Sequence, residues 1–157
     1  MSAEAKLVEM GLELPEVTEA LGSYVNAVRT GNLLFLSGGL PSDPERRFNG
    51  KVPSEVSVEC AKAAARQAML GRLAVIRREL GSLDRVARVV AVQGYVNSDP
   101  GFGDHPLVVN GASDLLIEVF GAEIGRHSRV AVGVGSLPLH VVVELALVVE
   151  VADDPAA

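Results

Sequence analysis

Short apolar runs bounded by turn residues mark the places where the chain is expected to form β-strands. A run of leucine and phenylalanine between two glycine-containing turns predicts a strand over 32–37, with 23–29 as its hairpin partner. The β-branched stretch 85–95 predicts a central strand. Near the end of the chain, the valine-rich runs 129–134 and 141–149 flank a Gly-Ser-Leu-Pro turn, which predicts a pair of neighbouring strands.

Two stretches between these strands carry helical periodicity instead. Over 54–80, small and apolar residues recur along one stripe, and Gly81 suits the C-terminal cap. Over 106–120, proline stands in the first turn, the apolar residues share one face, and Gly121 can end the helix. The stretch 40–53, with its prolines and an Asn-Gly pair, predicts a surface loop.

The predicted order of elements, ββαβαββ, indicates an α+β domain built on a mixed β-sheet. We expect both helices to pack on one face of this sheet, so that the opposite apolar face needs cover from other subunits. A chain of 157 residues is long enough for one well-buried core, and we expect a single domain over 1–157. Residues 1–20 and 152–157 are expected to be adaptable termini.

Composition narrows the class of protein further. No run approaches the roughly 20 uninterrupted apolar residues of a membrane-spanning helix, and the acidic start of the chain lacks the pattern of a secretory signal. The single cysteine, Cys60, fits a reducing compartment. We therefore expect a soluble, cytoplasmic protein with no membrane partner.

The charge argues against nucleic acid as a partner. A formal net charge of −6 would repel phosphate backbones, and the basic residues are spread thinly along the chain. With 2 tyrosines, 4 phenylalanines and no tryptophan, a surface for stacking bases is also disfavoured. A small anionic metabolite stays open as a ligand if cations are locally focused.

The sequence offers no motif for a metal ion or a dinucleotide. His105, His127 and His140 are too scattered for a recognised metal-ligand spacing. The Gly-Val-Gly stretch 133–135 is followed by a proline turn and a strand, whereas a dinucleotide fingerprint opens a helix. We predict neither a metal nor a cofactor.

Several separated segments occur in the order typical of one known family. They are Tyr24-Val25, Gly31-Asn32, Leu36-Ser37-Gly38 and Leu40-Pro41 near the start, Asn110 in the middle, and Ser128-Arg129-Val130-Ala131-Val132, Leu137-Pro138 and Val141-Val142-Val143-Glu144 near the end. Through these segments the chain resembles the YjgF/RidA family over about 22–151, which we take as the core of the domain. The resemblance implies the chorismate-mutase-like fold of that family.

The resemblance also implies an activity, namely hydrolytic deamination of reactive 2-imino and enamine acids to 2-keto acids and ammonia. Its implied setting is a homotrimer with clefts between subunits, and its implied partner is a small carboxylate metabolite. Arg129 would clamp the substrate carboxylate, since a guanidinium pairs with a carboxylate through two parallel hydrogen bonds. Glu144 would orient or deprotonate the attacking water.

The same resemblance places Tyr24, Ser37, Gly38, Asn110 and Ala131 around the substrate, with Tyr24 coming from a neighbouring subunit. Simpler roles stay open for several of them. A tyrosine near a strand start often only packs, a Ser-Gly pair often only forms a turn, and an asparagine can hydrogen-bond at a helix start.

Arg129 and Glu144 have simpler interpretations as well. Arg129 could be an arginine that ends a strand at the surface, and Glu144 a solvated or salt-bridged strand carboxylate. Whether the two side chains face the same cavity cannot be decided from the sequence pattern.

Departures from the family pattern place the chain in a divergent branch. Ala131 stands where many deaminase members have cysteine, so no thiol acts there, and 125–128 replaces an aromatic-Pro-Ala lead-in to the arginine. The stretches 42–51 and 99–105 also differ from shorter members. The alternative function is a non-catalytic small-molecule-binding trimer that uses the same inter-subunit cleft. A third function, ribonuclease, is ascribed to some relatives and is opposed by the acidic charge.

Overall fold

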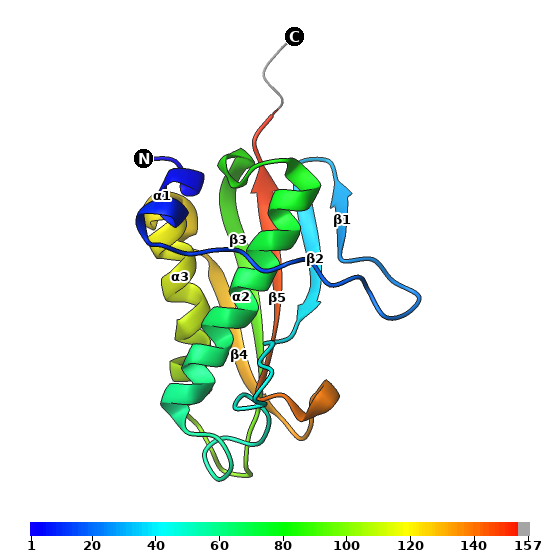
Figure 1. Cartoon of the computed structure of the whole chain (residues 1–157), viewed down its shortest axis with the longest axis vertical. Helices are drawn as coiled ribbons and strands as arrows, with labels where there is room; N and C mark the ends of the chain where they lie inside the picture. Colours follow the sequence, from blue (N-terminus) through cyan, green and yellow to red (C-terminus); the bar gives the residue numbers. More distant parts are fainter. Residues whose placement is uncertain (154–157) are drawn as a thin grey trace.

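The computed structural model describes residues 1–153, which form one sheet covered by helices (Figure 1). The strands are β1 (Ala27–Thr30), β2 (Leu33–Gly39), β3 (Val86–Asn97), β4 (Ser128–Val134) and β5 (Val143–Val151). The helices are α1 (Ala3–Glu9), α2 (Val58–Leu80) and α3 (His105–Gly125), and the short 3-10 helices are η1 (Leu83–Arg85) and η2 (Pro138–His140). The predicted order ββαβαββ is therefore present, with α1 added before it.

The strands lie side by side in the order β1-β2-β5-β3-β4. Strands β3 and β4 run parallel, and the other neighbours run antiparallel, so the sheet is mixed as predicted. The prediction that the last two strands are neighbours is wrong, because β3 lies between β4 and β5. The physical reason is the connection through α3, which is long enough to let β4 pair in parallel with β3 and leaves the other edge of β3 to β5.

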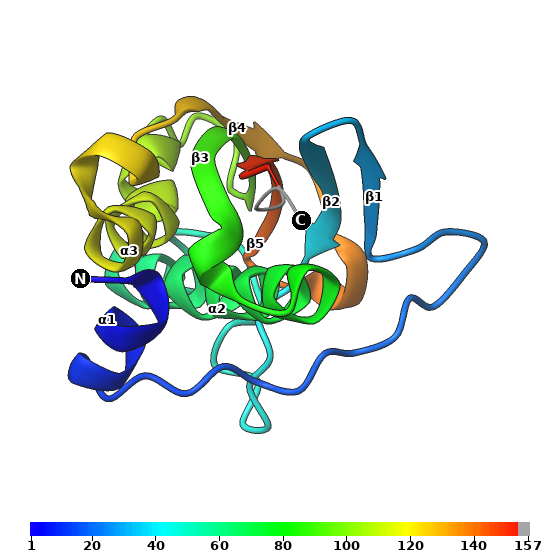
Figure 2. The same ribbon diagram turned by 90° about the horizontal axis from the view of Figure 1, so that it is seen from above.

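Helices α2 and α3 both cover one face of the sheet, as predicted (Figure 2). Helix α2 packs on β2 and β5, and α3 packs on β3 and β4. The expectation of an adaptable start is wrong for 3–9, which form α1 against α3. Ser2 caps this helix by accepting a hydrogen bond from the Ala5 N–H at 3.2 Å, and Leu7 is buried. Without its partner helix, such a short segment would not hold a helix.

The ends of the two long helices follow local capping rules. Helix α2 begins after Ser57, whose hydroxyl accepts from the Cys60 N–H, so the predicted start at 54 is too early. Gly81 caps α2 in the left-handed conformation, with a φ of 83°. In α3, Gly121 leaves the helical conformation where the sequence predicted the end, and one more turn follows to Gly125.

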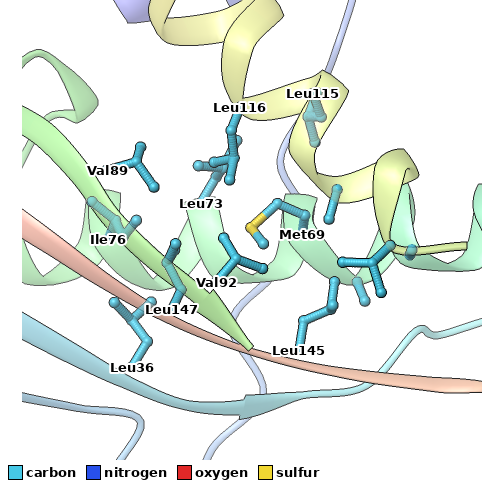
Figure 3. Packing of buried hydrophobic residues seen from close by; sticks show 14 of the residues in the cluster. Leu36, Met69, Leu73, Ile76, Val89, Val92, Leu115, Leu116, Leu145 and Leu147 are labelled. Carbon is cyan, nitrogen blue, oxygen red and sulfur yellow. The ribbon is translucent and has the colours of Figure 1, made fainter. Parts of the chain in front are cut away.

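The core lies between the helices and the covered face of the sheet (Figure 3). Its largest fully buried side chains include Met69, Leu73, Ile76, Leu115, Leu116, Leu145 and Leu147. Close approach of helix and sheet depends on a glycine of β3, Gly94, because a Cβ there would overlap the side chain of Val109 on α3. None of the helices in the described part of the chain is long and apolar enough to cross a membrane.

The other face of the sheet carries exposed apolar side chains. Val28 and Phe35 are direct cross-strand partners and are 55% and 44% exposed. Phe35 is in turn the partner of Val148 on β5. On β4, Val130 and Val132 are also exposed, at 52% and 41%. One chain therefore leaves an apolar sheet face uncovered, as the sequence predicted.

Replacing Leu73 with alanine is predicted to destabilise the fold strongly. Leu73 is fully buried in α2, and the cavity left by Leu→Ala should lower the free energy of unfolding by about 2–5 kcal/mol. Val8→Ala on α1 is the control, since Val8 is 81% exposed and its replacement should change the value by less than about 0.5 kcal/mol. Urea unfolding at one fixed protein concentration measures both, and equal effects of the two changes would contradict this packing.

Candidate functional site

Arg129 lies on β4 with its side chain turned toward α3. Its Nη1 donates hydrogen bonds to Asn110 Oδ1 at 2.7 Å and to Ser113 Oγ at 3.1 Å. Helix α3 begins at His105, so Asn110 stands in its second turn and does not act as a helix-start hydrogen bonder. The structure thus brings together two of the residues singled out from the sequence, and α3 fixes the direction of the Arg129 guanidinium.

A histidine extends this contact. His127 Nδ1 lies 2.7 Å from the carbonyl of Gly125, which can only accept, so this nitrogen carries the proton. The Nε2 of the neutral ring then accepts from the Ser113 hydroxyl at 2.9 Å, while the Ser113 oxygen accepts from Arg129. Burial lowers the pKa of His127, the positive charge of Arg129 lowers it further, and the Gly125 hydrogen bond opposes both.

Sequence reasoning missed Ser113 and His127 as partners of Arg129. The sequence did contain a signal for Ser113. Asn110 and Ser113 are three residues apart on the predicted helix and therefore lie on the same helix face. Beside this network lies a surface pocket of about 290 Å³ lined by Ser113, Ile117, Arg126, His127 and Arg129. Two guanidinium groups and two neutral hydrogen-bonding side chains favour an anionic ligand at this place.

Glu144 belongs to a different part of the sheet. Its neighbours in β5, Val143 and Leu145, are buried under the helices, so alternation turns Glu144 toward the opposite face. The side chain is half-buried beside β2, where a Cβ on Gly38 would overlap the Glu144 carboxylate. Burial raises the pKa of Glu144, and the positive charge of Arg72 on α2 opposes this rise.

Strand β2 has a bulge next to this carboxylate. The register between β2 and β5 shifts between Leu36 and Gly39, so Ser37 and Gly38 face a single residue of β5. The Ser37 hydroxyl donates to the Val25 carbonyl at 2.6 Å, and the Ser37 carbonyl accepts from Arg72 Nη1 at 2.9 Å. The Ser-Gly pair is therefore part of a bulged strand, and the interpretation as a simple turn is wrong.

Tyr24 immediately precedes Val25, whose carbonyl accepts the hydrogen bond from the Ser37 hydroxyl. Tyr24 is 54% exposed. It is near enough to Arg72 for an electrostatic interaction. Arg72 was not predicted as a site residue from the sequence, because arginines within a long amphipathic helix normally lie on its solvent-exposed face. Tyr24, Ser37, Gly38 and Glu144 thus gather around an arginine that the sequence pattern did not reveal.

Within one chain, two groups of residues lie apart. The Arg129 group consists of Asn110, Ser113, His127 and Arg129, and the Glu144 group consists of Tyr24, Ser37, Gly38, Arg72 and Glu144. Arg129 pairs with Val92 of β3, and Val92 pairs on its other side with Leu147, three residues from Glu144. Arg129 faces α3, whereas Glu144 points to the uncovered face, with β3 between their strands. Ala131 lies two residues beyond Arg129 on β4 and packs against the core. Across residues 1–153, no three His, Cys, Asp or Glu side chains are grouped to hold a metal ion.

Comparisons with known proteins agree with this fold. A model of the family described as "YjgF/chorismate mutase-like, putative endoribonuclease" matches residues 4–152. Protein TCP17 of Trypanosoma cruzi is 42% identical over 147 residues, which cover 93% of this chain and 92% of that protein.

Two solved structures are similar over nearly the whole chain. The protein Atu1372 from Agrobacterium tumefaciens, described as of unknown function, is 38% identical with a TM-score of 0.85, over 96% of this chain and 92% of its own. A protein from Shewanella oneidensis described as a putative endoribonuclease is 34% identical with a TM-score of 0.90, over 96% of this chain and 100% of its own. With the family model covering almost all described residues, the chain belongs to the YjgF/chorismate mutase-like family.

Proposed function

We propose that this protein is an imine deaminase that converts 2-imino and enamine acids to 2-keto acids and ammonia in clefts between the subunits of a homotrimer. The observation that carries the proposal is the orientation of Arg129. Its Nη1 is held by Asn110 and Ser113, and within residues 1–153 its Nε and Nη2 have no protein acceptor. That free edge has the geometry that binds a carboxylate through two parallel hydrogen bonds.

Glu144 supplies the second element of the proposed site. An enamine acid first becomes its imine tautomer. Water then adds to the imine carbon, and Glu144 accepts one of its protons and passes it to the nitrogen, which gives a carbinolamine. Glu144 next moves the remaining hydroxyl proton to the amino nitrogen as the carbon–nitrogen bond breaks, so ammonia leaves and the carbon keeps the water oxygen as the keto group. Partial burial raises the pKa of Glu144 and makes it a better base than an exposed carboxylate.

Positioning is the larger part of this mechanism. An imine carbon is already electrophilic, so a clamped substrate and a held water molecule replace a reaction between two free partners. Ala131 carries no nucleophile, which fits a mechanism in which water attacks directly.

The location between subunits is supported by three features of the chain. The Arg129 and Glu144 groups are separated by β3 in one protomer, so a shared cleft needs two copies. Arg129 lies on β4, which is at the edge of the sheet. The uncovered face carries exposed apolar side chains that a neighbouring subunit would bury.

Ribonuclease activity, suggested by the description of the Shewanella relative, is less compatible with this chain. Its net charge is −6, which opposes the approach of a phosphate backbone. The alternative of a binding trimer without turnover uses the same clamp and is separated from the deaminase by the following measurement.

Wild-type protein should accelerate ammonia release from 2-aminoacrylate or 2-iminopropionate generated in situ by a dehydratase or an amino-acid oxidase. Arg129→Lys should raise KM about tenfold or more, because the two parallel hydrogen bonds are lost. Glu144→Gln should lower kcat about 100-fold, since an amide cannot accept the proton.

The controls are Arg88→Lys on β3 and Glu150→Gln on β5, which change the same residue types on the same sheet outside both groups. Each should keep wild-type kinetics. Saturable binding of imino-acid analogues without any acceleration would contradict deamination and favour the binding trimer. Cleavage of RNA that survives in Arg129→Lys would point to a different site altogether.

Mixing two inactive variants should restore activity if each cleft uses two chains. When Arg129→Ala and Glu144→Gln chains assemble at random, roughly a quarter of the clefts combine an intact Arg129 group with an intact Glu144 group. Co-expression with two different affinity tags and ammonia release from the doubly purified protein measure the recovery.

A matched mixture tests the assignment of the groups. Arg129→Ala mixed with Asn110→Leu should recover nothing beyond the activity of Asn110→Leu alone, because both residues lie in the same group. Sedimentation equilibrium should give the mass of three chains. A monomer, or a Glu144→Gln mixture that stays inactive while trimeric, would contradict the inter-subunit site.

A further inference from the structure

Arg72 differs from the other arginines of α2. The helix contains four arginines. Three of them form surface ion pairs, Arg66–Glu118, Arg77–Glu4 and Arg78–Glu19. Arg72 instead points to the end of β2, donates to the Ser37 carbonyl, and buries its Nε without a partner in the described part of the chain. Burying a guanidinium is unfavourable, and burial accordingly lowers the pKa of Arg72.

The chain makes room for this arginine with two adjacent glycines. A Cβ on Gly39 would overlap the Arg72 guanidinium, and a Cβ on Gly38 would overlap the Glu144 carboxylate. Neither glycine has a positive φ, so the backbone conformation alone would allow other residues. Space is the reason for glycine here, and the two missing side chains let Arg72 and Glu144 approach the same bulge from two elements.

The groups around Glu144 come from different parts of the chain. The positive charge of Arg72 acts on Glu144 from α2, and Tyr95 is the direct cross-strand partner of Glu144 on β3. Tyr24, from the segment before β1, lies within electrostatic range of Arg72. Of these side chains, Arg72 alone is a cation near neutral pH, and its positive charge favours the ionised form of the carboxylate.

We propose that Arg72 is a positioning residue that anchors the β2 bulge through the Ser37 carbonyl and places a positive charge on the bulge that packs against the Glu144 carboxylate, so that the carboxylate is directed to orient water. The proposal rests on the deaminase function above and adds to it a residue on the α2 side of the site. Arg72 acts through Glu144 and the Ser37 carbonyl, whereas Arg129 contacts the substrate. The two arginines should therefore differ in the kinetic constant that they control.

Arg72→Met should lower kcat about tenfold or more while KM changes less than about threefold. In a plot of kcat against pH, the acidic limb should move to higher pH, because loss of the Arg72 cation raises the pKa of Glu144. Arg72→Lys should recover part of the kcat that Arg72→Met loses, because lysine keeps the positive charge but lacks the planar guanidinium with its several donors. Arg66→Met, on the same helix, should leave kcat and the pH profile unchanged.

Gly39→Ala provides a second variant that keeps all charged groups. The added methyl group occupies the place of the Arg72 Nε, so the guanidinium must move, and the fall in kcat and the shift of the acidic limb should resemble those of Arg72→Met. An unchanged pH profile in both folded variants would overturn the proposal. A large rise in KM with constant kcat in Arg72→Met would also overturn it, because Arg72 would then bind substrate directly.

A measurement without turnover separates this proposal from the proposed function. The ¹³C signal of the Glu144 carboxyl group, assigned with Glu144→Gln, should titrate at a higher pH in Arg72→Met than in wild type. If the midpoint moves but wild type shows no deamination, Arg72 positions Glu144 and the proposed function fails. If the midpoint does not move in folded Arg72→Met, the positioning role fails whatever the activity is.

Discussion

The pairing of β5 with strands on both of its sides is the constraint on which the rest of the structure depends. Strand β5 joins the β1–β2 hairpin to the β3–α3–β4 unit, so without it the sheet would fall into two parts. Its alternating side chains bury Val143, Leu145 and Leu147 under the helices. A shift of one residue would expose this apolar set and bury Glu144, so packing of the core fixes the direction of the carboxylate.

In the β3–α3–β4 part of the fold, packing between helix and strand positions Arg129. Helix α3 connects the parallel strands β3 and β4, and one face of α3 therefore lies against the edge strand β4. Arg129 then meets Asn110 and Ser113, and His127 completes the network as a neutral acceptor. The guanidinium is thereby held with one edge free. In the proposed function, preorganisation of this kind would orient a small carboxylate without any movement of the protein.

Close packing explains why small residues occur beside the charged ones. Gly94 admits Val109 of α3 to the sheet, and Gly38 and Gly39 admit Glu144 and Arg72 to one bulge. The unfavourable burial of Arg72 is opposed by its hydrogen bond to β2 and by the nearby carboxylate. The apolar face on the other side of the sheet remains open in one chain. The proposed inter-subunit site would need a second copy of the chain, and such a copy could also cover this face.

The sequence by itself determined the local elements and the family. Periodicity located both long helices and all strands within a few residues, and Gly81 marked a helix end, because these features depend on neighbours in the chain. Separated motifs identified the family, and they named Arg129 and Asn110, which the fold then joined by a hydrogen bond.

Tertiary structure alone decided which distant residues meet. It inserted β3 between β4 and β5, formed α1 by packing it on α3, and placed His127 and Arg72 in the two groups. It also put Arg129 and Glu144 on opposite faces of the sheet, so that one chain holds them apart. The pattern of the sequence carries no such information, because strand pairing and the burial of a charge depend on contacts between segments far apart in the chain.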